Sequence, residues 1–152
     1  MCEKEHFNDL ILRLGGEILE FGTSVKTVEQ AVRATGADAG QIIKAMLLIT
    51  EKAGAILAIV DGRSRIDLKK VEKRFGKVRL ALPREVKEIT GCEVGELPPI
   101  GIPLKTLINP RILEKSYVIG GGGAVNRLIR IDPRKIVEAQ NAEIEDISAE
   151  MR

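Results

Sequence analysis

The sequence predicts one α/β (α+β) domain with a curved, mixed β-sheet or barrel-like core flanked by helices. Two observations lead to this prediction. A chain of 152 residues suits a single domain that buries its core without disulfides or metals. Its apolar segments read as about seven short strands interleaved with about four helices, without an internal repeat or a dividing linker. Residues 1–152 are therefore expected to fold as one unit.

The first elements follow from helical spacing and caps. A helix is predicted over 7–14, where apolar residues recur every three or four positions before two glycines. A short apolar segment at 18–21 suits a strand. Thr27 with Gln30 three positions later predicts a capped helix that ends at Gly36.

The two longest apolar runs predict the centre of the sheet. QIIKAMLLIT at 41–50 and AILAIV at 55–60 have the length and β-branched content of buried strands, and the charged, glycine-bearing break at 51–54 predicts a hairpin. Asp67 then predicts the N-cap of a helix that ends before Gly76.

In the second half of the chain, short predicted strands alternate with predicted helices. The predicted elements are a strand over 78–82, a helix from Pro83 to Ile89, strands over 105–108 and 116–119 with a turn at Asn109 and Pro110, a strand over 127–131, and a helix capped by Asp132 with Pro133 first. The tail beyond is amphiphilic and acidic.

Composition limits the partners. With 44% apolar and 30% charged residues, the chain has a soluble, globular composition, and its apolar runs are shorter than a membrane span. The start MCEKEHFND lacks the apolar core of a signal peptide, so we expect a cytoplasmic protein without membrane contact. A net charge of +2 is too small to predict binding of duplex DNA. With only 3% aromatic residues, the chain is not expected to bind single strands by stacking on their bases. Contact with RNA would then run through phosphates and a terminal residue.

Cysteine and histidine are scarce. Cys2, His6 and the distant Cys92 fall short of four zinc ligands, so no metal and no other cofactor is expected. Cys92 could act as a nucleophile only with His6 as its base, and His6 lies in a predicted helix at the far end of the chain. Cys92 is better explained as a small loop residue.

The loop TGCEVGELPPIG at 90–101 is the segment that folding alone explains least. Gly91, Gly95 and Gly101 permit left-handed backbone or close approach of another chain segment, while Pro98 and Pro99 stiffen the chain between them. The loop should form a rigid ridge with exposed N–H and C=O groups. Such a ridge suits a small ligand.

A run of four glycines at 120–123 admits two interpretations. It lacks the third glycine of the dinucleotide-binding motif, since Val125 or Asn126 stands there, and a strand follows in place of a helix. A phosphate-binding Gly-Lys-Ser/Thr motif is also absent, which argues against phosphoryl transfer. The run is either a turn or bulge in the sheet or a cradle for a ligand.

Lys44 interrupts the apolar run at 41–50 and likewise has two interpretations. Its side chain could extend to the rim of the sheet or protect an edge strand. Alternatively, the ammonium group projects into a cavity, where it would attract a carbonyl, carboxylate or phosphate oxygen.

Taken together, Lys44 in QIIKAMLLI, the loop TGCEVGELPPIG and the segment SYVIGGGGAVNRLIRIDP resemble the YbaK and ProX group of aminoacyl-tRNA deacylases. These are free-standing relatives of the editing domain of bacterial prolyl-tRNA synthetases. The resemblance covers 27–137, with 1–24 as an N-terminal extension. It implies the editing-domain fold and metal-independent hydrolysis of the ester that joins a wrong, small amino acid to the 3′ end of a tRNA. The tRNA acceptor end would be the partner, and a synthetase is a second candidate.

The resemblance also implies site residues. Lys44 corresponds to the critical lysine of the family, and two glycine segments would border the amino-acid pocket. The expected substrate-binding residues are Gly91, Gly95, Pro99, Gly101, Gly120, Gly121, Gly122, Gly123 and Asn126. The corresponding mechanistic hypothesis has Lys44 hold the terminal phosphate or carbonyl region, while N–H groups of both glycine segments polarise the ester carbonyl and water, oriented by a ribose hydroxyl, attacks.

One departure from the family concerns the strand after the glycines. Some members carry an acidic residue where this sequence has Arg127, Leu128 and Ile129, and Asn126 is the nearest polar candidate. The identity of the amino acid therefore stays open. A non-catalytic module that binds an aminoacyl group or a tRNA end alongside a synthetase is the alternative function.

Overall fold

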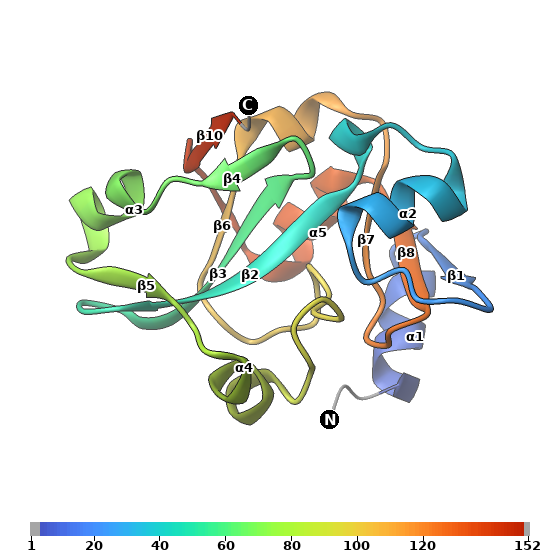
Figure 1. The fold of residues 1–152 in the computed structure, drawn as a ribbon, viewed down its shortest axis with the longest axis horizontal. Helices are drawn as coiled ribbons and strands as arrows, with labels where there is room; N and C mark the ends of the chain where they lie inside the picture. Colours follow the sequence, from blue (N-terminus) through green and yellow to red (C-terminus); the bar gives the residue numbers. More distant parts are fainter. Residues whose placement is uncertain (1–3, 151–152) are drawn as a thin grey trace.

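The computed structural model describes residues 4–150, which form five α-helices, two 3₁₀-helices and ten strands (Figure 1). The helices are α1 (Lys4–Arg13), α2 (Val28–Thr35), η1 (Ala39–Gln41), α3 (Leu68–Phe75), α4 (Pro83–Thr90), η2 (Pro110–Glu114) and α5 (Pro133–Gln140). The strands are β1 (Glu17–Glu20), β2 (Ile43–Thr50), β3 (Gly54–Asp61), β4 (Ser64–Ile66), β5 (Val78–Leu80), β6 (Thr106–Ile108), β7 (Val118–Gly121), β8 (Arg127–Ile131), β9 (Glu143–Ile144) and β10 (Ser148–Glu150).

The predicted hairpin forms the centre of a mixed sheet. Strands β2 and β3 pair antiparallel over their whole length, from Ile43 opposite Asp61 to Thr50 opposite Gly54. The sheet order is β5-β2-β3-β6-β9, in which β6 runs parallel to both of its neighbours. The predicted mixed α/β class is thus confirmed.

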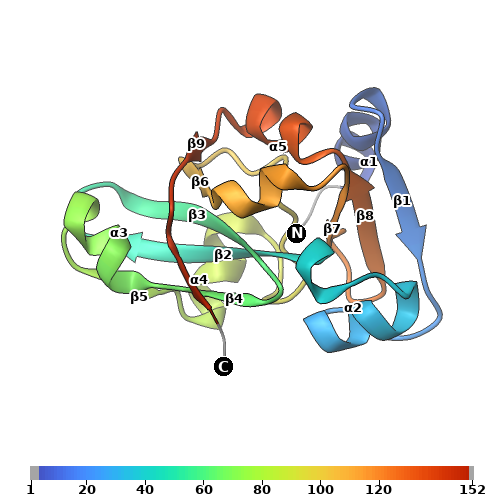
Figure 2. The same cartoon turned by 90° about the horizontal axis from the view of Figure 1, so that it is seen from above.

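A second sheet joins the first at one point. Its order is β1-β8-β7, and a single parallel bridge between Ile42 and Ile119 connects its β7 edge to the start of β2. Figures 1 and 2 show the two sheets curving around a shared interior, with α1 and α5 on one side and α2 and α3 outside. This junction places the glycines at the end of β7 beside the N-terminal half of β2.

Burial of apolar side chains holds the layers together. The largest cluster fills the curved interior and collects residues from both sheets and from α1, α4, α5 and η2. A second cluster lies between α3 and the other face of the β2–β3 hairpin, and a third packs α2 against the junction of β2 with β7. Typical members of the three clusters are Ile11, Ile59 and Ile136; Leu48, Val71 and Phe75; and Val25, Ala31 and Ile119.

The predicted caps explain why such short helices form. Thr27 and Gln30 build the expected capping box of α2, and Gly36 ends that helix in the left-handed conformation at φ 74°. Asp67 and Asp132 cap α3 and α5 with their side chains. The longest helix between residues 4 and 150 has ten residues, so no helix there is able to cross a membrane.

Three details differ from the prediction. The described residues contain more strands than the seven expected, because β4, β9 and β10 have two or three residues and show no apolar alternation. The turn at Asn109 and Pro110 continues as the 3₁₀-helix η2. Gly120 and Gly121 belong to β7, so only the second half of the glycine run is a turn.

Candidate functional site

Lys44 lies where the central sheet is incomplete. On the side of β2 away from β3, strand β5 pairs with 48–50, and β7 forms a single bridge at Ile42, next to the start of β2. Between these contacts, no strand of residues 4–150 pairs with β2 on that side. A cavity of about 310 Å³ opens there, and we name it the Lys44 cavity.

Five segments enclose the Lys44 cavity. They are the N-terminal half of β2, the stretch 25–31 that starts α2, the ridge at 94–97 and the strands β7 and β8. Its wall is mainly apolar, and its polar side chains are those of Lys26, Thr27 and Lys44. The apolar wall includes Val28, Ala31, Ile42, Ala45, Met46 and Leu128.

Two glycines of β7 line the cavity with bare main chain. A Cβ on Gly120 would lie 3.1 Å from Ile43 Cγ1 and 3.2 Å from Pro99 Cγ. A Cβ on Gly121 would lie 2.6 Å from the Leu97 carbonyl oxygen. The ridge therefore packs directly on β7, a contact that only glycine permits.

The direction of the main-chain donors follows from the β7–β8 ladder. The Gly122 N–H donates to the Arg127 carbonyl at 3.0 Å, and the Gly123 N–H donates to the Glu96 carbonyl at 3.0 Å. Because pairs alternate in an antiparallel ladder, Gly120 directs its N–H toward β8, and Gly121 directs its N–H away from β8. Gly121 is thus the residue of the glycine run whose N–H can face the cavity.

The Lys44 amine is half-buried and anchored. Its Nζ donates to the Ser64 carbonyl oxygen at 2.7 Å, which is its one hydrogen bond within residues 4–150. Burial lowers the pKa of Lys44, since it removes water from the ammonium group, and the negative charge of Asp61 partly opposes this effect. Two of the three ammonium hydrogens remain for a ligand.

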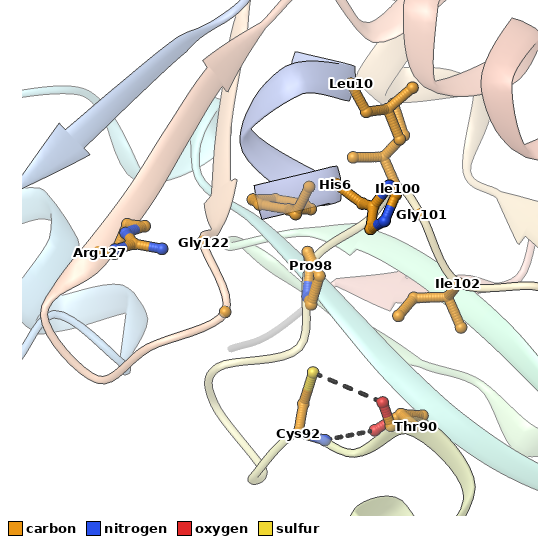
Figure 3. Close-up of a pocket in the computed structure, with 12 residues that line it drawn as sticks. His6, Leu10, Thr90, Cys92, Pro98, Ile100, Gly101, Ile102, Gly122 and Arg127 are labelled. Carbon is orange, nitrogen blue, oxygen red and sulfur yellow. Dashed lines mark hydrogen bonds between the residues drawn. The ribbon is translucent and has the colours of Figure 1, made fainter. Parts of the chain in front are cut away.

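A second, smaller pocket is lined by residues of α1, of the ridge and of the second half of the glycine run (Figure 3). It has a volume of about 170 Å³. Figure 3 shows His6 and Leu10 from α1 near Ile100 and Gly101, with Pro98 and Gly122 nearby. Gly101, Gly122 and Gly123 line this pocket, and the Lys44 cavity does not include them.

The structure therefore divides the predicted site residues. Gly95, Gly120 and Gly121 line the same cavity as Lys44, and Pro99 contacts Gly120 from the ridge. Gly91 is the left-handed C-cap of α4, at φ 78°, and lines neither pocket. The exposed Asn126 lines neither pocket, and its Nδ2 donates to the Phe21 carbonyl at 3.2 Å.

Several lining residues had no sequence signal that marked them as functional. The sequence predicts only a helix that starts at Thr27 for this part of the chain, and it places Met46 and Leu128 in predicted strands without a site role. The sequence also did not point to Asp61 and Ser64, which contact each other next to Lys44. A carboxylate directly after the apolar run 55–60 was the available clue to Asp61.

Within residues 4–150, no three His, Cys, Asp or Glu side chains gather as a metal site would require. Cys92 is buried in the ridge segment, where its N–H donates to Thr90 Oγ1 at 3.1 Å. Thr90 and Cys92 line the smaller pocket.

Comparison with known proteins agrees with this architecture. Residues 23–139 match the aminoacyl-tRNA editing domain. The chain belongs to that family. The matched span of the editing domain contains β2, the ridge and both glycine segments, and it excludes α1 and β1.

Relatives of this editing domain include free-standing proteins of similar length. It is 33% identical over 125 residues to the protein YwhH of Bacillus subtilis (strain 168), covering 80% of each chain. It is 25% identical over 126 residues to EbsC of Enterococcus faecalis (strain ATCC 700802 / V583), provisionally named a Cys-tRNA(Pro)/Cys-tRNA(Cys) deacylase, covering 80% of this chain and 77% of EbsC. A crystal structure described provisionally as a trans-editing enzyme for prolyl tRNA synthetase superposes with a TM-score of 0.85 and 29% identity, covering 98% and 99% of the two chains.

Proposed function

We propose that this protein is a trans-editing deacylase, which hydrolyses the ester of a mischarged aminoacyl-tRNA and releases a small amino acid. The observation that carries the proposal is the placement of the Lys44 amine and the main chain of Gly121 and Gly95 around one cavity. Membership of the editing-domain family and the names of two relatives support it. Such a substrate would place the reaction in the cytoplasm, where tRNA is charged.

The Lys44 cavity suits a small acyl group next to a charged or carbonyl group. Its volume of about 310 Å³ and its apolar wall match a short side chain, with Lys44 at one end. The tRNA acceptor end would bring the 3′-terminal adenosine to the rim. Since one similar structure is described as an enzyme for prolyl tRNA synthetase, we include a synthetase as a candidate partner.

The chemistry needs no covalent nucleophile, because an aminoacyl ester is already activated toward water. In the proposed reaction, water adds to the ester carbonyl carbon, the bond to the ribose oxygen breaks, and that oxygen takes a proton as the amino acid leaves. Lys44 holds the phosphate or carbonyl region with its two remaining N–H groups, and the Gly121 N–H donates to the developing oxyanion. Each such donor contributes roughly 10²–10³-fold in rate.

Fewer main-chain N–H groups can polarise the ester carbonyl than the sequence hypothesis assumed. Gly122 and Gly123 use their N–H groups inside the fold, so they shape the site without binding the oxyanion. Gly95 lines the cavity from the ridge, and Pro99 packs on Gly120 without lining the cavity. The proposed reaction is metal-independent, and we expect full activity in the presence of EDTA.

A panel of mischarged tRNAs tests the function. Wild-type protein should release a small amino acid, and Lys44→Ala should lower the rate by at least about 100-fold without loss of the folded state by circular dichroism. Lys135→Ala on α5 is the control for loss of a lysine distant from the cavity. Binding without release would favour the non-catalytic module, and full turnover by Lys44→Ala would remove the role assigned to the lysine.

A further inference from the structure

A buried polar turn joins β3 to β4 and contacts the Lys44 side chain. Asp61 and Ser64 in this turn are 4% and 0% exposed. Ser64 Oγ donates to Asp61 Oδ1 at 2.7 Å, and the Arg63 N–H donates to Asp61 Oδ2 at 3.3 Å. The carbonyl of the same Ser64 accepts the hydrogen bond from Lys44 Nζ at 2.7 Å.

A carboxylate in such a place needs compensation. Burying an ionised group costs several kcal/mol unless hydrogen bonds and an opposite charge offset the loss of water. The Asp61 carboxylate accepts two hydrogen bonds, and its negative charge interacts with the Lys44 ammonium group. The charge of Asp61 therefore favours the ammonium form of Lys44.

Other charged groups near Lys44 are exposed to solvent. Glu29 and Arg33 on α2, with Lys44, line an open groove next to the cavity, and Lys26 lines the cavity itself. Arg63 is paired with Asp38 at 2.5 Å. Water screens these groups, whereas Asp61 acts through the interior.

The turn itself is rigid. The Gly62 N–H donates to the Ile42 carbonyl at 2.6 Å, and a Cβ on Gly62 would lie 2.5 Å from the Ala39 carbonyl oxygen. The turn thus packs against η1 and the start of β2. The Ser64 carbonyl is consequently held at a fixed position relative to Lys44.

We propose that Asp61 and Ser64 are positioning residues for Lys44, which hold its amine in place at the cavity through the buried turn that Lys44 Nζ contacts. The inference rests on the proposed function only where deacylation is measured. Since Asp61 opposes the effect of burial, its neutralisation should lower the pKa of Lys44 further. As the pH rises, any activity that needs the ammonium form should then decline at a lower pH than in the wild type.

The direct test follows the lysine Cε signals by NMR in the full-length protein across pH, with Lys44→Arg to assign the signal. Asp61→Asn keeps the shape and should move the Lys44 titration to lower pH. Asp146→Asn, which removes the partner of Lys70 at 3.0 Å, should leave the Lys44 titration in place. An unchanged Lys44 titration in folded Asp61→Asn would overturn the proposal.

Kinetics supply the second readout. With a mischarged tRNA that the wild type hydrolyses, Asp61→Asn should lower kcat about 10-fold or more, change KM little, and shift the alkaline limb of kcat/KM to lower pH. If Asp61→Asn does not fold, Ser64→Ala carries the test, because loss of its hydroxyl should reduce the NMR order of the Lys44 side chain, and Ser64→Thr should restore it. Unchanged order in Ser64→Ala would contradict the proposal. A shifted Lys44 titration in a protein without deacylase activity would refute the proposed function alone.

Discussion

Gly121 and Leu97 meet without room for a side chain between them. A Cβ on Gly121 would lie 2.6 Å from the Leu97 carbonyl oxygen and 3.0 Å from that of Glu96. Two segments more than 20 positions apart thereby form one continuous main-chain wall of the Lys44 cavity. The width of the cavity depends on this contact.

Gly121→Ala should force the ridge away from β7. We expect a loss of about 1–3 kcal/mol in unfolding free energy and a clear drop in deacylation, measured by chemical denaturation and by release of amino acid. Gly22→Ala is the matched control, since no atom lies within 4 Å of its Cβ position. Wild-type activity in Gly121→Ala would show that the contact does not set the site.

Thr27→Ala should affect both stability and the cavity. The Thr27 hydroxyl accepts from the Gln30 N–H at 3.1 Å, and loss of such an N-cap costs about 1 kcal/mol. Because Thr27 itself lines the cavity and α2 supplies Val28 and Ala31 to its wall, kcat/KM should fall several-fold.

Asp132→Ala separates these two effects. It removes the N-cap of α5, where the Asp132 carboxylate accepts from the Arg134 N–H at 2.9 Å, away from the cavity. The stability loss should be similar, with no change in activity. Equal losses of activity in the two variants would mean that α2 acts only through global stability.

The ionised carboxylate of Glu85 should contribute to stability at neutral pH and lose that contribution in acid. Its carboxylate accepts two hydrogen bonds from Arg79, at 2.7 and 2.9 Å, and one from the Leu82 N–H at 2.8 Å. The Arg79 pair, followed by the Leu82 bond, lowers the pKa of Glu85 to about 2. This stabilisation is complete above the unfolded pKa of about 4.3 and is lost as the pH falls toward 2.

Glu85→Gln should therefore lower Tm by a few degrees at pH 7, and the difference from wild type should shrink below pH 4.5. Thermal melts across pH measure this directly. Glu88→Gln, at an exposed position on the same helix, controls for removal of a surface charge. A difference that stayed constant down to pH 2 would contradict the assignment.

Arg127 and Glu20 should respond unequally to mutation. Arg127 is 6% exposed, and its Nε has no hydrogen-bond partner in the described part of the chain. Its guanidinium contacts the carboxylate of Glu20 at 3.0 Å, and the Glu20 side chain is 67% exposed. Arg127→Met should leave the unfolding free energy unchanged or raise it, because a buried apolar chain replaces a costly charge. Glu20→Gln should lower it by about 1 kcal/mol, since the buried guanidinium loses its counter-charge. The reverse order in denaturant melts would disprove this account.

Local sequence signals determined most of the secondary structure. The capping box at Thr27, the caps at Asp67 and Asp132, and the apolar runs of β2 and β3 act over a few neighbouring residues, so they can be read without a structure. Lys44 was also identifiable, because a charge within an apolar run is a local anomaly. The resemblance to editing domains rested on such short motifs as well.

Only the tertiary structure decided which of the predicted residues share a cavity. Gly120 and Gly121 line the Lys44 cavity, whereas Gly122 and Gly123 line the smaller pocket, because β7 ends at Gly121 and the chain turns there. Asp61 and Ser64 reach Lys44 through a turn about twenty positions away. Contacts of this kind depend on how the sheets close and on where β2 lacks a neighbour, and no local pattern in the sequence encodes them.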